Sequence, residues 1–232
     1  RELTTLAGQN HGANRLTCFA GAGAYDHFIP AFIDQLISRG EFLTAYTPYQ
    51  GEASQGSLQA FFEFQSQIAR LTGLDIANAS LYEGASATAE AVLLAVNHTG
   101  KSRVLIGAPL HPDYRQVLST VFQDLPIELI DLPHTGAGTV DPKSVADATD
   151  DNTACLVLQS PNLYGLVEDW TACFGALKAK TPGALAIGVF NPIACALLKS
   201  PGACGADVAA GEGQPLGIPL QLGGPYLGLL SA

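Results

Sequence analysis

The sequence has no methionine and few charged residues, since Asp, Glu, Lys and Arg make up 14% of its 232 residues. Positive charge is the scarcer sign: 11 basic residues stand against 21 acidic ones, which gives a net charge of −10. No basic cluster offsets this charge, which argues against binding to nucleic acid or to an anionic membrane. Small molecules and other proteins remain as partners.

Long apolar runs are also absent, because none approaches the roughly 20 residues that span a bilayer, and no basic-then-apolar leader is present. Since the chain begins at Arg1 and has no methionine anywhere, we expect it to be part of a longer protein. Its length is enough for one large domain with a two-layer or three-layer core. No linker long enough to divide the chain is visible.

Paired metal-ligand motifs are missing as well. The cysteines have no C-x-x-C spacing and the histidines have no i, i+4 zinc spacing, which predicts no metal site. We expect buried, reduced thiols and therefore a cytoplasmic protein. The residues concerned are Cys18, Cys155, Cys173, Cys195, Cys204, His11, His27, His98, His111 and His134.

Apolar runs rich in β-branched residues alternate with segments of helical period. Strands are predicted at 76–81, 103–107, 127–131, 154–159 and 185–190. Helices are predicted for a stripe from Phe28 to Ile37 that stops at Gly40, and at about 55–71, 87–96, 113–122, 142–148 and 170–180. Repeated strand-helix-strand order predicts right-handed crossovers and an α/β domain with a mostly parallel sheet flanked by helices.

The stretch 83–91 follows a predicted strand, turns on small residues and opens a helix. Two interpretations stay open. Free backbone N–H groups and the hydroxyls of Ser86 or Thr88 would suit a phosphate, or the turn is an N-cap with tight packing beneath it. A nucleophile elbow is disfavoured because Thr88 replaces the required glycine.

The tail segment 206–219 resembles the strand and turn that carry the Schiff-base lysine in enzymes of the aspartate-aminotransferase fold. Gln214 stands in the place of that lysine. Pyridoxal phosphate needs a primary amine to form an internal aldimine, and an amide nitrogen cannot provide one because its lone pair is delocalised. The segment therefore resembles a coenzyme scaffold without its covalent anchor.

Four ordered blocks resemble glycine dehydrogenase (decarboxylating) subunit 1, the N-terminal-half type of glycine cleavage system P-protein. They are FAGAGAYDHFIP (19–30), YTPYQGEASQG (46–56), GLDIANASLYEG (73–84) and GEGQPLG (211–217). The blocks are spread over nearly the whole chain, which makes the resemblance specific.

The resemblance implies an aspartate-aminotransferase-like large domain (pyridoxal-phosphate-dependent transferase fold type I) over residues 1–232, with an N-terminal arm. A smaller C-terminal domain would follow Ala232. It also implies a partner, glycine dehydrogenase subunit 2, that holds pyridoxal phosphate. The complete enzyme of that family decarboxylates glycine and transfers the aminomethyl group to the lipoyl arm of the H-protein.

The resemblance assigns four degenerate cofactor positions to this chain, at Ser86, His111, Asn191 and Gln214. Asn191 replaces the aspartate that pairs with the pyridinium nitrogen, and an asparagine carries no charge to keep that nitrogen protonated. His111 lies near the place where such folds stack a ring on the cofactor, and a structural role is expected for it here. Two requirements for coenzyme chemistry therefore fail together.

The loop from Tyr46 to Gln55 is the best candidate for reaching a working site. Tyr46, Tyr49, Gln50 and Glu52 are predicted to lie at a pocket, where they would hydrogen-bond substrate or cofactor, or at an interface, where they would pack against the partner. The sequence alone leaves both open.

Two other functions are weighed against the P-protein subunit. One is a self-sufficient pyridoxal-phosphate transaminase or lyase, whose anchor would have to be among Lys101, Lys143, Lys178, Lys180 and Lys199. All five lie in predicted surface helices or loops, which disfavours this function. The other is a scaffold or regulatory pseudoenzyme that binds the partner and leaves its turnover unaffected.

Overall fold

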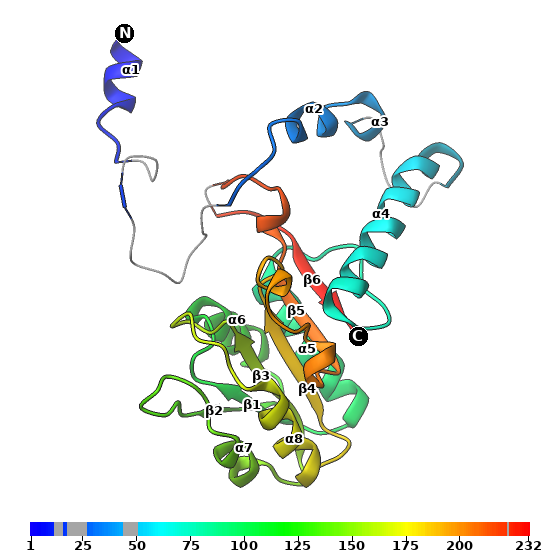
Figure 1. The fold of residues 1–232 in the computed structure, drawn as a ribbon, viewed down its shortest axis with the longest axis vertical. Helices are drawn as coiled ribbons and strands as arrows, with labels where there is room; N and C mark the ends of the chain where they lie inside the picture. Colours follow the sequence, from blue (N-terminus) through cyan, green and yellow to red (C-terminus); the bar gives the residue numbers. More distant parts are fainter. Residues whose placement is uncertain (12–15, 18–26, 44–50, 222) are drawn as a thin grey trace.

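The computed structural model describes residues 1–11, 16–17, 27–43, 51–221 and 223–232, with the backbone alone for residues 51–54. A six-stranded sheet in the order β2-β1-β3-β4-β5-β6 forms its centre (Figure 1). The first five strands pair in parallel and the sixth is antiparallel to β5. The strands are β1 (Arg103–Gly107), β2 (Glu128–Leu132), β3 (Thr153–Ser160), β4 (Leu185–Phe190), β5 (Val208–Glu212) and β6 (Gly228–Ser231).

Helices cover both faces of this sheet. α5 (Gly84–Thr99) and α6 (Pro112–Phe122) pack on one face, where Val104, Ile106 and Leu118 belong to one buried cluster. α7 (Pro142–Ala148) and α8 (Trp170–Lys180) pack on the other, where Leu105 and Phe174 belong to a second cluster. Because successive strand residues point to opposite faces, coverage of both faces explains why the central strands are apolar throughout.

Most of the predicted elements are confirmed. The strands at 103–107 and 185–190 and the helices at 142–148 and 170–180 have the predicted bounds. The other predicted strands and helices between residues 84 and 190 differ from the observed ones by a few residues at their ends. A mostly parallel α/β sheet flanked by helices is therefore the architecture.

The predicted strand at 76–81 is wrong as a regular strand. This segment forms two isolated antiparallel bridges to β6, at Ala77–Ser231 and Leu81–Gly228. It therefore runs parallel to β5 at the edge of the sheet. β6 itself was not predicted, because its four residues are too short a run to show a period, and only pairing with β5 defines them as a strand.

The N-terminal helices also differ from the prediction. The stripe from Phe28 to Ile37 forms only the short helix α2 (Ile33–Ile37), and Gly40, predicted as its stop, begins α3 (Gly40–Leu43). Neither α2 nor α3 has a buried residue, so no packing supports a longer helix there. The terminal helix α1 (Glu2–Ala7) likewise buries nothing.

Helix α4 (Gly51–Thr72) is attached to the sheet only through its C-terminal half. Ile68 is buried, and Gln65 Nε2 donates to the Ala77 carbonyl at 2.7 Å. The N-terminal half extends away from the sheet in Figure 1, and Phe61 in that half is 40% exposed. In the described part of the chain, no helix combines the length and the apolar character needed to cross a membrane.

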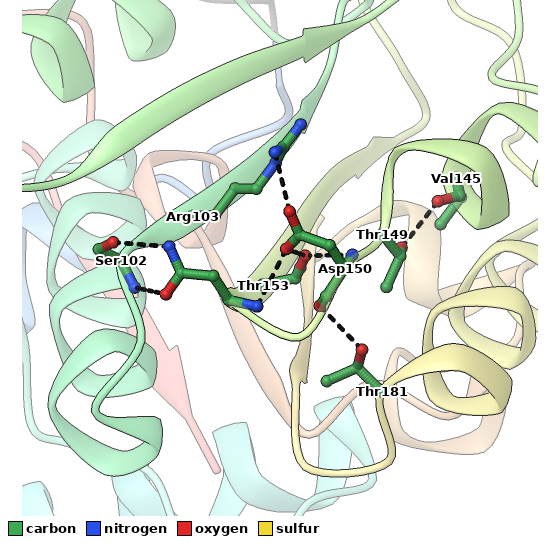
Figure 2. Close-up of polar contacts among 8 residues, drawn as sticks. Ser102, Arg103, Val145, Thr149, Asp150, Thr153 and Thr181 are labelled. Atoms are coloured by element: carbon green, nitrogen blue, oxygen red, sulfur yellow. Dashed lines mark hydrogen bonds and ion pairs between the residues drawn. The ribbon is translucent and has the colours of Figure 1, made fainter.

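A polar network fixes the edge of the sheet where β1 and β3 begin (Figure 2). Arg103 Nη1 donates to Asp150 Oδ2 at 2.9 Å, and Thr153 Oγ1 donates to Asp150 Oδ1 at 2.9 Å. Thr181 Oγ1 donates to the Asp150 carbonyl at 3.0 Å, which links the end of α8 to the same loop. The side chains at this edge therefore bond one another.

Gly228→Ala should destabilise the fold by about 1–3 kcal/mol through overpacking. A Cβ at Gly228 would lie 2.5 Å from the Glu83 carbonyl oxygen and 2.7 Å from Leu81 Cβ. The control is Gly175→Ala at an exposed position of α8, where a Cβ meets nothing within 4 Å. That change should stabilise by about 0.5–1 kcal/mol. Urea unfolding midpoints measure both, and equal midpoints would contradict the packing described at β6.

Candidate functional site

The carboxyl ends of the parallel strands meet the turn into α5 at one edge of the sheet. Asn191 directly follows β4, and Gln214 lies two residues beyond β5. The 76–81 segment is bridged to β6 and runs parallel to β5, so Glu83 and Gly84 arrive at this same edge. Ligand sites in open α/β sheets lie at this end of the strands.

Gln214 is buried and its side chain is held by its own turn. Only 4% of the residue is exposed. Its Nε2 donates to the Ile218 carbonyl, and its backbone N–H donates to Glu212 Oε1 at 2.8 Å. The amide therefore closes the loop after β5 and does not present a reactive nitrogen.

The first turn of α5 is capped by two glutamates. Glu83 is the N-cap, and its carboxylate accepts the N–H groups of Ala85 at 2.6 Å and Ser86 at 2.9 Å. Gly84 N–H donates to Glu212 Oε2 at 3.0 Å, and Ala87 N–H donates to the Glu83 carbonyl at 3.0 Å. A helix leaves its first N–H groups without intrahelical partners, and here those of Gly84, Ala85 and Ser86 all have a side-chain carboxylate as acceptor.

Glu212 joins three segments at this edge. Besides Gly84, its carboxylate accepts the N–H groups of Gln214 and of Leu227, the latter at 3.2 Å. Burial raises the pKa of the Glu212 carboxyl, and the nearby Glu83 raises it further, while the three backbone N–H groups oppose the shift. Glu212 therefore links α5, the turn after β5 and the approach to β6.

The hydroxyl groups of this turn are also engaged. Ser86 Oγ donates to the Glu83 carboxylate, and Thr88 Oγ1 donates to the Gly84 carbonyl at 2.8 Å. A Cβ on Gly84 would lie 2.0 Å from the Tyr114 hydroxyl oxygen and 3.0 Å from the Glu212 nitrogen. Of the two alternatives raised by the sequence, the turn is thus built as an N-cap with tight packing beneath it.

His111 serves as the N-cap of α6. Its Nδ1 accepts the Asp113 N–H at 3.1 Å, and its own N–H donates to Gln159 Oε1 at 2.8 Å. Its ring centroid lies 5.2 Å from that of Tyr114, with the two planes tilted by 35°. The geometry gives His111 a local structural task at the start of this helix.

Asn191 holds the turn that leads from β4 into a short 3-10 helix (Ala194–Ala196). Its Oδ1 accepts the N–H groups of Ile193 at 2.9 Å and Ala194 at 3.3 Å. It also lines a cavity of about 360 Å³ between the ends of β3 and β4 and the start of α8, together with Ser160, Glu168, Trp170, Cys195 and Lys199 among others. Asn191 and Gln214 thus lie at neighbouring strand ends, each bonded to its own following turn.

Glu168 is the buried acid of that cavity wall, with 5% of the residue exposed. Its carboxylate accepts Asn162 Nδ2 at 2.7 Å and the Val140 N–H at 2.9 Å. Burial raises the pKa of the Glu168 carboxyl, although both hydrogen bonds act in the opposite direction. All of these contacts tie loops together, so Glu168 is a structural acid.

The candidate loop at 46–55 is not tested by the structure. Tyr46, Tyr49 and Gln50 lie outside the described residues, and Glu52 is described only as backbone at the start of α4. The described residues contain no group of three or more His, Cys, Asp or Glu that is arranged to hold a metal ion.

Sequence reasoning missed Glu212 and Glu168. Glu212 stands two residues before Gln214 in the segment that drew attention to the missing lysine. The signal available was a lone acidic residue at the end of the apolar run 208–212. Glu168 gave no such signal, since only tertiary packing buries it.

The comparisons with known proteins agree with this architecture. A NifS-like protein superposes with a TM-score of 0.64 at 12% identity, over 85% of this chain and 53% of that one. A crystal structure of glycine decarboxylase (P-protein) of the glycine cleavage system, in inhibitor-bound form, superposes with a TM-score of 0.88 at 44% identity, over 100% of this chain and 51% of that one. The chain therefore has the fold of the pyridoxal-phosphate-dependent transferases of fold type I.

The comparisons also assign this chain to one family within that fold class. Residues 1–232 match the family described as glycine cleavage system P-protein. The probable glycine dehydrogenase (decarboxylating) subunit 1 of Syntrophomonas wolfei is 49% identical over 231 residues, which cover 100% of this chain and 52% of that protein. This chain belongs to the P-protein family, and it spans about half the length of the curated relatives it matches.

Pyridoxal phosphate does not fit the residues at this edge. The position after β5 carries an amide bonded to Ile218, and the position after β4 carries an uncharged amide bonded to Ile193 and Ala194. The N–H groups at the start of α5, which would suit a phosphate, are bonded to Glu83 and Glu212. Neither an aldimine anchor, a charged partner for the ring nitrogen nor a free anion cradle is formed.

Glu168 gives a pH-dependent prediction. Because its pKa is raised above the ordinary glutamate value of about 4.3, the folded state holds the proton more tightly than the unfolded state does. The resulting stability is complete at low pH and is lost as pH rises through the raised pKa. The free energy of unfolding of the wild type minus that of Glu168→Gln should therefore fall as the pH rises above about 4.3, the ordinary glutamate value.

The exposed Glu128→Gln variant corrects for removing one negative charge. Unfolding in urea at each pH provides the measurement. A difference that grows with pH would contradict the raised pKa.

Proposed function

We propose that this chain is the subunit of the glycine cleavage P-protein that does not bear pyridoxal phosphate. In this proposal it works with glycine dehydrogenase subunit 2, which holds the coenzyme on a lysine. The assembled enzyme decarboxylates glycine and passes the aminomethyl group to the lipoyl arm of the H-protein. When bound there, the coenzyme supplies the electron sink for decarboxylation.

The observation that carries the proposal is the buried Gln214 amide, bonded to Ile218 in the turn where the family resemblance places a lysine. A buried, hydrogen-bonded amide neither forms a Schiff base nor leaves room for one. Asn191 supports the same conclusion, because its side chain is uncharged and its Oδ1 is hydrogen-bonded within the turn that follows β4. The subunit's task then lies in assembly and in shaping a pocket that another chain completes.

Apolar side chains on the N-terminal helices support a protein partner. The exposed large apolar residues of this region are Phe28, Phe32, Leu36, Ile37, Phe42, Leu43, Leu58, Phe61 and Phe62. Concentrations of exposed apolar side chains mark interaction surfaces. The proposal therefore assigns α2, α3 and the start of α4 to the contact with the partner subunit. In this proposal, residues 1–232 form the large domain together with its N-terminal arm.

A cytoplasmic location is part of the proposal. Cys155, Cys173, Cys195 and Cys204 are all free thiols. Burial raises the pKa of the Cys173 thiol to about 12, so this thiol stays protonated and inert. Such thiols suit a reducing compartment.

Reconstitution tests the function directly. The partner subunit, loaded with pyridoxal phosphate, is assayed for glycine–bicarbonate exchange with lipoylated H-protein, with and without this chain. We expect exchange above background only when both chains are present, because each supplies part of the pocket. Exchange at the same rate without this chain would favour a scaffold or regulatory pseudoenzyme.

Borohydride reduction distinguishes the remaining alternative. Reduction of the reconstituted enzyme should fix the coenzyme on the partner alone, as peptide masses report. Coenzyme fixed on a lysine of this chain would instead favour a self-sufficient enzyme. Lys199 is the residue to inspect first, because it lines the same cavity as Asn191.

Tyr49→Phe tests whether the 46–55 loop reaches the pocket. Loss of one hydroxyl hydrogen bond worth roughly 0.5–1.5 kcal/mol should slow exchange about twofold to tenfold. The control is Tyr164→Phe, which removes a hydroxyl that contacts His134 Nε2 at 3.3 Å. Unchanged exchange with intact assembly in Tyr49→Phe would remove the pocket role and leave the interface role.

A further inference from the structure

The start of α5 is the place where this chain would meet the anionic end of a coenzyme bound at position 214. Gly84 N–H is bonded to Glu212, and Glu212 also accepts the Gln214 N–H, so the helix start and the 214 turn share one carboxylate. The N-terminus of a helix of this length attracts anions through its free N–H groups and its dipole. In this chain the anions already there are its own side chains.

Those N–H groups have no capacity left. Gly84, Ala85 and Ser86 donate to the carboxylates of Glu212 and Glu83, and Ala87 donates to the Glu83 carbonyl. The Ser86 hydroxyl donates to the Glu83 carboxylate as well. An incoming phosphate would have to displace Glu212 to bond Gly84 and Glu83 to bond Ala85 or Ser86, and it would then lie beside their charges.

The surroundings hold the two carboxylates in place. Glu212 is bonded to three separate segments, through Gly84, Gln214 and Leu227. Gly84 and Ala85 are buried, and the Tyr114 hydroxyl occupies the space next to Gly84. The carboxylates therefore belong to the packing of this edge and are not loose side chains that a ligand would push into solvent.

We propose that Glu83 and Glu212 make this chain reject the phosphate group of pyridoxal phosphate, independently of the missing lysine and aspartate. The inference rests on the proposed function, in which this subunit does not bear the coenzyme, and deepens it. The chain's own Glu83 and Glu212 carboxylates occupy the N–H groups that would bind an anion. Restoring the anchor alone then does not restore a preference for the phosphorylated coenzyme.

The test compares two probes that differ only in the phosphate, pyridoxal phosphate and pyridoxal. The full subunit, in complex with its partner, receives Asn191→Asp and Gln214→Lys, which supply the charged ring partner and the amine. A second variant adds Glu83→Ser, which replaces the N-cap carboxylate with an uncharged hydroxyl cap, and Glu212→Gln, which keeps one acceptor oxygen without the charge. Equilibrium dialysis and borohydride trapping on this chain give the binding ratio of the two probes for each variant.

With both glutamates present, we expect pyridoxal phosphate to bind no more than about threefold better than pyridoxal, because the helix start offers the phosphate no free donor. With both replaced, the preference should rise by roughly tenfold or more. An imperfectly placed lysine would weaken the binding of both probes equally, so it does not change the ratio of the two within one variant. Circular dichroism checks that each variant is folded.

The matched control adds Glu90→Gln and Glu128→Gln in place of the two site substitutions, which removes the same charge from exposed positions. Its ratio should equal that of the parent variant. A tenfold preference for the phosphorylated probe with Glu83 and Glu212 intact would overturn the inference. An unchanged ratio after their replacement would also overturn it.

Failure of the proposed function has a different signature. It would appear in the unsubstituted chain, either as coenzyme trapped on one of its own lysines or as partner turnover that ignores its presence. Neither result depends on the ratio between the two probes, so the two conclusions are tested separately.

Discussion

Two carboxylates at the start of α5 hold the functional edge of this domain together. Glu83 and Glu212 accept three of the first four N–H groups of the helix, and Glu212 extends the connection to Gln214 and Leu227. Carboxylates are favourable at a helix N-terminus because they bond the unpaired N–H groups and oppose the positive end of the dipole. Here they stabilise the fold at a point where a related architecture could hold a ligand.

The same edge combines the strand arrangement of fold type I with turns that are closed by their own side chains. The parallel sheet still brings the ends of β4, β5 and the turn into α5 to one place. Each of these places, however, is closed locally. Asn191 caps the turn after β4, Gln214 closes the turn after β5, and Glu83 caps α5. The polar groups at these three places are therefore satisfied by hydrogen bonds within the chain.

The polar side chains at the carboxyl ends of β4 and β5 have hydrogen-bond partners within the chain, whereas the N-terminal arm exposes large apolar residues. Phe28 is 88% exposed, and α2 and α3 bury nothing. Surface of this kind costs free energy in water unless it is covered. Both regions are consistent with the proposed role, in which this chain is a subunit that contacts a partner through its N-terminal helices.

The sequence by itself determined the α/β class, the bounds of β1, β4, α7 and α8, and the replacement of an amine by an amide at Gln214, because periodicity and residue chemistry are local. It left the turn at 83–91 open between a phosphate cradle and a cap. Only the tertiary structure decided this, since the answer depends on Glu212, which lies 128 residues from Gly84. Likewise, β6 and the bridged segment at 76–81 are defined only by each other and by β5. Contacts between distant segments leave no period in either one, and for that reason the sequence did not reveal them.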